Sequence, residues 1–322
     1  MASPAQSSSA QPSSAQSSSA QSSSAQPSSA QSTDVKDPAA AAPVVAAPAA
    51  PKARRRPPWA VLTAGLLLAL IVLAALAPGL FASASPTAID PVNALQGPGS
   101  AHLLGTDQLG RDLWSRLVHG AGPALSIGFG STVIAMAGGA VLGLAAALGG
   151  RWADQLLMRA ADVLLALPAT LLALLAIAVL GTGTGNLVLA LGFALVPGYG
   201  RMVRSEALLV RRSGYVEAAV ALGVPRPLLI LRHVLPNSLA PLLTLATVGF
   251  GTALIAASAL SFLGLGPRPP SPEWGAMLAE GRGFLETAWW LGVFPGAAVT
   301  VTVVAVTVVG RHLQQRFTRR SA

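Results

Sequence analysis

The 322-residue chain is 52% hydrophobic and only 10% charged, and its mean hydropathy is +0.60. A water-soluble domain carries roughly a quarter charged residues because its surface faces water, so this composition favours an integral membrane protein. The chain has no cysteine, which excludes disulfides, thiol catalysis and cysteine-based metal sites. Its net charge of +9 would also fit nucleic-acid binding, but the positions of the basic residues argue against that function.

Residues 1–57 form the first predicted unit. An Ala-Gln-Ser/Pro-Ser-Ser unit recurs from Ala5 to Ala30, and an Ala/Pro-rich run continues to Pro51. Because this stretch contains no leucine, isoleucine or aromatic residue, it has no apolar face to bury, and a disordered tail is predicted. The tail is interpreted either as a tether for a partner or as a low-complexity extension without a role of its own. Its composition favours the second interpretation.

Six apolar stretches follow the tail, each close to the ~20 residues that cross a bilayer as a helix. Strict alternation of polar and apolar residues is missing, which favours a helical bundle over a barrel. Gly139 and Gly143 have the spacing that allows two helices to pack closely in lipid. The predicted units are residues 58–119 (first helix and loop), 120–310 (a five-helix core) and 311–322 (a basic end). The predicted spans are Trp59–Phe81, Leu125–Leu148, Leu156–Leu180, Leu187–Val203, Leu239–Leu265 and Trp289–Val309.

The distribution of basic residues predicts the orientation. One set of loops and ends holds 16 lysines and arginines, and the opposite set holds four. Because basic residues concentrate on the cytoplasmic side, both termini and the long loop after Val203 are expected there, in a plasma or inner membrane. The basic excess is thereby explained by topology rather than by nucleic-acid binding.

Few residues within the spans support chemistry. Asp162 is the only acid near a span interior, and we interpret it as an interfacial residue paired with Arg159 rather than as a proton carrier. The only lysines, Lys36 and Lys52, precede the first span, so no phosphate-binding glycine-rich loop with its lysine is present. The four histidines show no metal-binding spacing. We expect no catalysis, cofactor or metal in this chain, so energy for transport would enter from another protein.

The loop at residues 211–237 is the candidate docking site for such a protein. Tyr215–Leu222 suits a short helix, Gly223 suits a left-handed turn after it, and Pro227 suits the first turn of a second short helix. Two interpretations remain open: a helix that enters a groove on a partner, or an amphipathic connector on the membrane surface. The face concerned would carry Val216, Ala219 and Val220.

Three segments of the chain carry a family resemblance. Glu217-Ala218-Ala219, then Gly223 and His233-Val234-Leu235-Pro236, is similar to the "EAA" motif of ATP-binding-cassette (ABC) importer permeases. The segments 102–116 and 260–275 are similar to the dipeptide/oligopeptide/nickel branch of that family. The resemblance covers about residues 58–310, whereas the Arg-rich C-terminus and the repetitive tail depart from the branch.

The resemblance implies a six-helix type I importer transmembrane domain that acts as the second, DppC/OppC-like permease subunit for peptides or nickel chelates. Its partners would be a homologous permease, two ATPase subunits that bind ATP and Mg²⁺, and an extracytoplasmic solute-binding protein. A stand-alone channel or secondary transporter and a non-transporting scaffold are the alternatives. By the resemblance, the residues that couple to the ATPase are Glu217, Ala218, Ala219, Gly223, Leu235 and Pro236.

A second candidate contact lies on the extracytoplasmic side. Its residues would either contact the binding protein or orient an interfacial helix, with Asp112 and Arg116 as an i,i+4 pair, and the structural role is favoured. Trp274 is a candidate interface anchor. The candidate residues are Asp107, Arg111, Asp112, Arg116 and Trp274.

Overall fold

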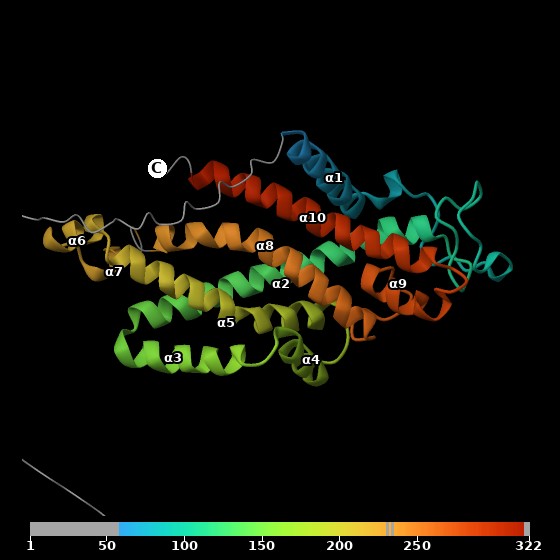
Figure 1. Ribbon diagram of the computed structural model, residues 1–322. Coiled ribbons are helices and arrows are strands. Elements are labelled where there is room, and N and C mark those ends of the chain that lie inside the picture. Colours follow the sequence, from blue (N-terminus) through green and yellow to red (C-terminus); the bar gives the residue numbers. More distant parts are fainter. Residues whose placement is uncertain (1–57, 230–231, 233–234, 319–322) are drawn as a thin grey trace, which may run out of the picture. The chain divides into compact units, whose positions relative to one another are not determined.

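The structure, a computed structural model, describes residues 58–229, 232 and 235–318 (Figure 1). The predicted tail at residues 1–57 lies outside the described residues. Every regular element in the described part is a helix, and the one β contact there is an isolated bridge between Thr106 and Asp112. The all-α prediction is confirmed.

Among the described residues, five helices are long and apolar enough to cross a membrane, and there are six spans if one bent pair counts as a span. The prediction of six spans holds if the bent pair crosses as one span. The five helices are α1 (Pro58–Leu76), α2 (Leu113–Leu148), α5 (Thr184–Arg211), α8 (Leu235–Phe262) and α10 (Trp290–Thr318).

The bent pair corrects the prediction of a single helix over Leu156–Leu180. Helix α3 (Gly150–Leu165) and helix α4 (Ala169–Leu180) meet at an angle of 92°. Pro168 lies between them with an extended ψ of 134°. The proline ring lacks an N–H group and disfavours the helical conformation of the residue before it, so the helix ends and a new one starts in another direction.

Helix α2 begins well before the predicted Leu125. The Asp112 carboxylate caps it, because Asp112 Oδ2 accepts a hydrogen bond of 2.8 Å from the Ser115 backbone N–H. The 36 residues of α2 extend for about 54 Å, whereas a bilayer core is about 30 Å thick. One end of α2 therefore carries residues that lie beyond the hydrocarbon.

Helices α2 and α5 form the most extensive helix pair of the bundle. A β-carbon added to Gly139 would lie 2.3 Å from Tyr199 Cβ, and one added to Gly143 would lie 2.4 Å from the Gly200 carbonyl oxygen. Only glycine permits this approach of the two backbones, so the predicted close packing at Gly139 and Gly143 is confirmed. Helix α8 packs against α2, α5 and α10, and α1 packs against α2 and α10.

Ion pairs join α3 to α5. Asp154 accepts a hydrogen bond of 2.6 Å from Arg204 Nη2, and Asp162 pairs with Arg201. The predicted pairing of Asp162 with Arg159 is wrong. Arg159 lies on the same helix as Asp162, but the packing of α5 beside α3 supplies Arg201 from another helix.

The shorter elements gather at the two ends of the bundle (Figure 1). At one end lie α6 (Gly214–Ala221) and α7 (Arg226–Leu229). At the other end lie α9 (Trp274–Gly281) and the segment 77–112 that connects α1 to α2. These two ends carry the two groups of candidate site residues.

Candidate functional site

The elbow, defined as residues 211–229, consists of α6, a tight turn and α7. Gly223 has a φ of +77°, and the Val224 backbone N–H donates to the Ala219 carbonyl at 3.1 Å. This is the hydrogen bond of a Schellman turn, which glycine forms without strain because it has no β-carbon. The predicted left-handed turn at Gly223 is confirmed, as is Pro227 in the first turn of the next helix.

The inner face of α6 packs against the elbow itself. Val216 and Ala219 are 2% and 9% exposed, and they form an apolar cluster with Leu229 of α7. Val216 and Ala219 therefore pack inside the elbow, where α7 covers them, and the docking of this helix in a groove on a partner stays a prediction. The side chain of Val220 lies outside the described residues.

The outer face of the elbow is apolar and open. Leu222 is 84% exposed, Leu228 is 45% exposed, and Ala218, one helical turn before Leu222, is exposed as well. Of the other residues assigned to coupling, Glu217 lies on α6, and Leu235 and Pro236 are the first two residues of α8. The side chains of these three lie outside the described residues. Contact of these apolar side chains with another protein stays a prediction, because single exposed apolar residues are common on protein surfaces.

At the opposite end of the bundle, four charged residues form a buried ion cluster, defined as Asp107, Arg111, Arg116 and Glu280. Asp107 Oδ2 accepts from Arg111 Nε at 2.6 Å and from Arg116 Nη1 at 2.9 Å. Glu280 Oε2 accepts from Arg111 Nη2 at 2.5 Å and from Arg116 Nη2 at 3.1 Å. The two carboxylates balance the two guanidinium groups, which is the condition for keeping such charges away from water.

The backbone around the cluster leaves no room for larger residues. Gly105 has a φ of +82° and Gly110 a φ of +72°. A β-carbon on Gly110 would lie 1.7 Å from the Asp90 carbonyl oxygen. Between these glycines, the Thr106 carbonyl accepts a hydrogen bond of 3.1 Å from Trp290 Nε1. The segment 105–116 is therefore a folded cap whose turns place both arginines beside α9.

The residues predicted to contact a binding protein are mostly inside this cap. Asp107, Arg111 and Arg116 are 1–3% exposed, and Trp274 is 2% exposed with its Nε1 donating to the Leu117 carbonyl. Their burial favours the structural interpretation. Contact with a binding protein stays a prediction, and Asp112 is the partly exposed member of the set.

The expected pair between Asp112 and Arg116 is corrected by the structure. Asp112 caps α2, and its Oδ1 lies 3.0 Å from His102 Nδ1. Arg116 instead pairs with Asp107 and Glu280. The i,i+4 spacing places Asp112 and Arg116 on one helix face only if both residues lie inside the helix. Asp112 is the capping residue, so its side chain folds back onto the first turn.

Two acids at this end of the bundle were not identified from the sequence. Glu280 completes the ion cluster, and Glu273 is fully buried at the start of α9. One signal was available for Glu280: the segment 105–116 holds two arginines and two acids, and one of those acids precedes a helix as its cap. An additional carboxylate from elsewhere in the chain is then needed to balance the second arginine.

Glu273 caps α9 with both carboxylate oxygens. Oε1 accepts from the Gly275 N–H at 2.9 Å, and Oε2 accepts from the Ala276 N–H at 2.8 Å. Burial nevertheless raises the pKa of the Glu273 carboxyl above its ordinary 4.5, because removal from water disfavours the anion more than these bonds favour it.

The raised pKa of Glu273 predicts a pH-dependent stability. Below pH 4.5 the carboxyl is protonated in both states, and its contribution to the free energy of unfolding is complete. As the pH rises through the raised pKa, the folded state must bury a charge, so this contribution is lost. We expect the melting temperature of the wild type, relative to that of Glu273→Gln, to fall as the pH rises above 4.5. The exposed Glu286→Gln serves as control, and parallel curves for wild type and Glu273→Gln would contradict the prediction.

No group of three or more histidine, aspartate or glutamate side chains among the described residues is arranged to hold a metal ion. The two ends thus differ in character: the elbow exposes apolar side chains, and the opposite end is a charge-balanced cap.

A family comparison covers the elbow. The profile of the family described as "Binding-protein-dependent transport system inner membrane component" matches residues 139–321. The chain is 42% identical over 249 residues to the dipeptide transport system permease protein DppC of Alkalihalophilus pseudofirmus, which covers 77% of this chain and 82% of that relative.

Two further relatives are also named as peptide or glutathione permeases. The chain is 43% identical over 226 residues to the di/tripeptide transport system permease protein DppC of Pseudomonas aeruginosa, covering 70% of this chain and 75% of the relative. It is 40% identical over 219 residues to the glutathione transport system permease protein GsiD of Pectobacterium atrosepticum, covering 68% and 73%.

Among solved structures, the fold is similar to a chain of the MetNI methionine ABC transporter in an inward-facing conformation. The TM-score is 0.52 at 19% sequence identity, and the match covers 64% of this chain and 96% of that one. At this level of sequence identity the comparison supports the fold alone.

Proposed function

We propose that this chain carries short peptides across a membrane. It belongs to the family of binding-protein-dependent transport system inner membrane components, and it is a multi-pass permease subunit of an ABC importer. The observation that supports peptide cargo is the set of relatives near 40% identity, whose names specify dipeptides, di/tripeptides and glutathione. Glutathione is itself a tripeptide. Nickel chelates, the other cargo implied by the resemblance, have no relative among these three.

The elbow is the proposed contact with the ATPase. It joins the inner ends of α5 and α8, so a push on the elbow acts directly on two helices of the bundle. Leu222 and Ala218 offer an apolar outer face, while Val216 and Ala219 fix α6 to α7 so that the elbow moves as one body. Glu217, Ala218, Ala219, Gly223, Leu235 and Pro236 form this coupling region in our proposal.

The partners follow from the family. Importers of this family work with ATPase and substrate-binding proteins, so this chain is a transport component of such a system. Our finer proposal is one homologous permease, two ATPase subunits that carry ATP and Mg²⁺, and one extracytoplasmic binding protein. This chain would hold no cofactor. The comparisons lend no support to a stand-alone channel.

The proposed orientation places the elbow and both termini in the cytoplasm. Trp59 and Trp152 are 66% and 81% exposed, and each lies beside arginines at the start of α1 or α3. Trp289 is 53% exposed at the start of α10, near the opposite end. Exposed tryptophans mark the two membrane interfaces, and the basic side faces the cytoplasm.

The test is uptake by the complete importer in proteoliposomes. The tagged chain is purified from its native membranes in mild detergent, the co-purifying proteins are identified by mass spectrometry, and the complex is reconstituted with ATP inside. We expect a second permease, ATPase subunits and ATP-dependent uptake of a labelled dipeptide, with no uptake of the free amino acids. Nickel uptake without peptide uptake would contradict the cargo. Conductance by this chain alone would contradict the subunit composition.

A further inference from the structure

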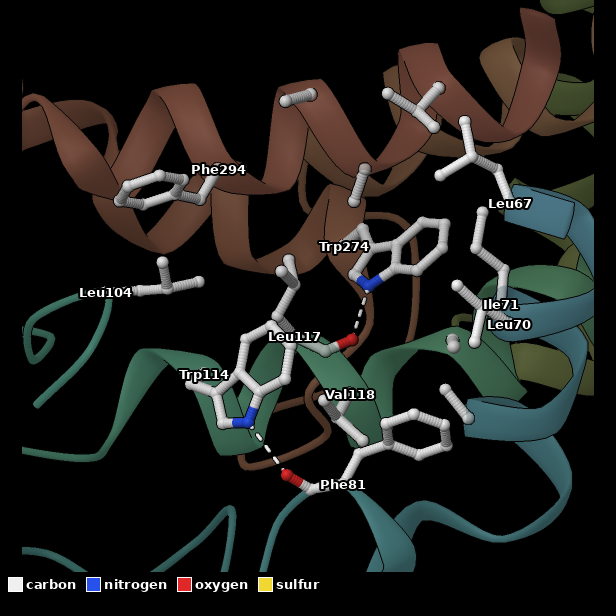
Figure 2. A pocket seen from close by; sticks show the side chains of 15 residues that line it. Leu67, Leu70, Ile71, Phe81, Leu104, Trp114, Leu117, Val118, Trp274 and Phe294 are labelled. Carbon is white, nitrogen blue, oxygen red and sulfur yellow. Dashed lines mark hydrogen bonds between the residues drawn. The ribbon is translucent and has the colours of Figure 1, made fainter. Parts of the chain in front are cut away.

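An apolar cavity of about 430 Å³ lies between α1, α2 and α10 (Figure 2). Its walls come from the second half of α1, the first turns of α2 and of α10, and Trp274 of α9. Leu67 and Leu70 line it and are still 44% and 43% exposed, so the cavity opens sideways between membrane-spanning helices.

The polar atoms on the cavity wall are already occupied. Trp114 Nε1 donates to the Phe81 carbonyl and Trp274 Nε1 donates to the Leu117 carbonyl, both at 2.9 Å, and Figure 2 shows both bonds. The two indole rings therefore present only carbon atoms to the cavity. A polar guest would lose its hydrogen bonds to water here without replacement, so the cavity suits a hydrocarbon.

A second, polar cavity of about 330 Å³ adjoins the first, and Phe81 and Trp114 line both. It lies on the segment 77–112 and is lined by Ser100, His102 and Asp112 among others. His102 Nδ1 lies 3.0 Å from Asp112 Oδ1. Of the described residues that line it, none is a lysine or an arginine and Asp112 is the one acid, so its charge is offset among them by His102, when protonated, and by the N-terminus of α2 that it caps.

The depth of the two cavities matches one leaflet of a bilayer. From Leu67 to Leu76, the end of α1, the helix rises about 13 Å. Half of a bilayer core is about 15 Å. The apolar cavity thus occupies the hydrocarbon depth, and the polar cavity occupies the headgroup depth beyond the end of α1.

We propose that these two cavities form one binding site for a phospholipid with an ethanolamine headgroup, with an acyl chain in the apolar cavity and the headgroup in the polar one. Hydrocarbon of the surrounding bilayer fills the apolar part, because an empty space would lose contacts on every wall. The headgroup decides which lipid stays: the primary ammonium of ethanolamine can donate hydrogen bonds to the Asp112 carboxylate, whereas the methylated ammonium of choline has no N–H to donate and a glycerol headgroup has no cation. The site does not depend on the nature of the cargo.

The first test fills the cavity. Ala298 lines it on α10, and Ala298→Phe places a ring where the acyl chain would lie. Val304→Phe, on the same helix at a position 54% exposed and outside the cavity, is the matched control. The intact importer is purified from its membranes, and its bound lipids are counted by native mass spectrometry. We expect one phosphatidylethanolamine per chain in the wild type and in Val304→Phe, and about a tenfold lower retention in Ala298→Phe.

The second test addresses the headgroup and leaves the apolar cavity unaltered. The wild type and Asp112→Asn, which keeps a helix-capping side chain but removes the charge, are placed in nanodiscs of phosphatidylethanolamine, phosphatidylcholine or phosphatidylglycerol mixtures before the same measurement. We expect the wild type to select phosphatidylethanolamine and Asp112→Asn to lose much of that preference. Equal retention of all three lipids by the wild type, equal retention by Ala298→Phe and Val304→Phe, or detergent or peptide as the retained molecule would each overturn the proposal.

Discussion

Replacing Glu280 by glutamine should destabilise the protein by about 3–5 kcal/mol, because it leaves Arg111 and Arg116 buried with Asp107 as their one counter-charge. Arg116 is 1% exposed and Arg111 is 2% exposed, so water cannot replace the missing carboxylate. At about 2 °C per kcal/mol, the value for the largest domains that this scaling covers, the corresponding fall in melting temperature is roughly 6–10 °C. Thermal unfolding in detergent, followed by tryptophan fluorescence, measures it.

Two controls make this result specific. Glu286→Gln removes an equal charge from an exposed position after the same short helix, and its melting temperature should match that of the wild type. Adding Arg111→Met to Glu280→Gln restores charge balance, so the double variant should regain part of the lost stability. Equal melting temperatures for Glu280→Gln and Glu286→Gln would show that the ion cluster contributes no more to the free energy of unfolding than a surface ion pair.

Replacing Gly223 by aspartate should leave the protein inserted but uncouple it from ATP hydrolysis. A residue with a β-carbon at a φ of +77° costs about 1–2 kcal/mol, which is close to a tenfold change in an equilibrium constant. A β-carbon there meets no atom within 4 Å, so the cost comes from the backbone alone and the fold can survive by rotating α6 against α7. We expect normal protein levels in the membrane and at least about tenfold less peptide uptake.

Gly214 offers the matched control for Gly223. It lies in the same elbow, has no positive φ, and a β-carbon there also meets no atom within 4 Å. Gly214→Asp adds the same charge without the backbone strain, so it should retain most of the uptake. Gly223→Asn, which adopts a left-handed conformation more readily than most residues, should lie between the two. Equal loss in Gly214→Asp and Gly223→Asp would show that charge, and not the turn, explains the effect.

Short-range patterns in the sequence determined much of the protein. The apolar runs predicted where helices lie. Exposing apolar side chains to water, or unpaired backbone groups to lipid, costs free energy, and this cost depends on each segment alone. The turn at Gly223 and the close contact at Gly139 and Gly143 followed from the missing β-carbon, which is also a local property. The similarity of residues 211–237 to the importer motif pointed to the family that the comparisons confirm.

Only the tertiary structure decided which residues meet across helices. Glu280 lies 169 residues from Arg111, and Arg201 lies 39 residues from Asp162, so no spacing rule connects them. The same holds for Val216 and Ala219, whose face is covered by α7 once the elbow folds back. Helical periodicity predicts that a face is apolar or charged, but the packing of one helix against another determines what covers it, because that packing depends on all the side chains between them.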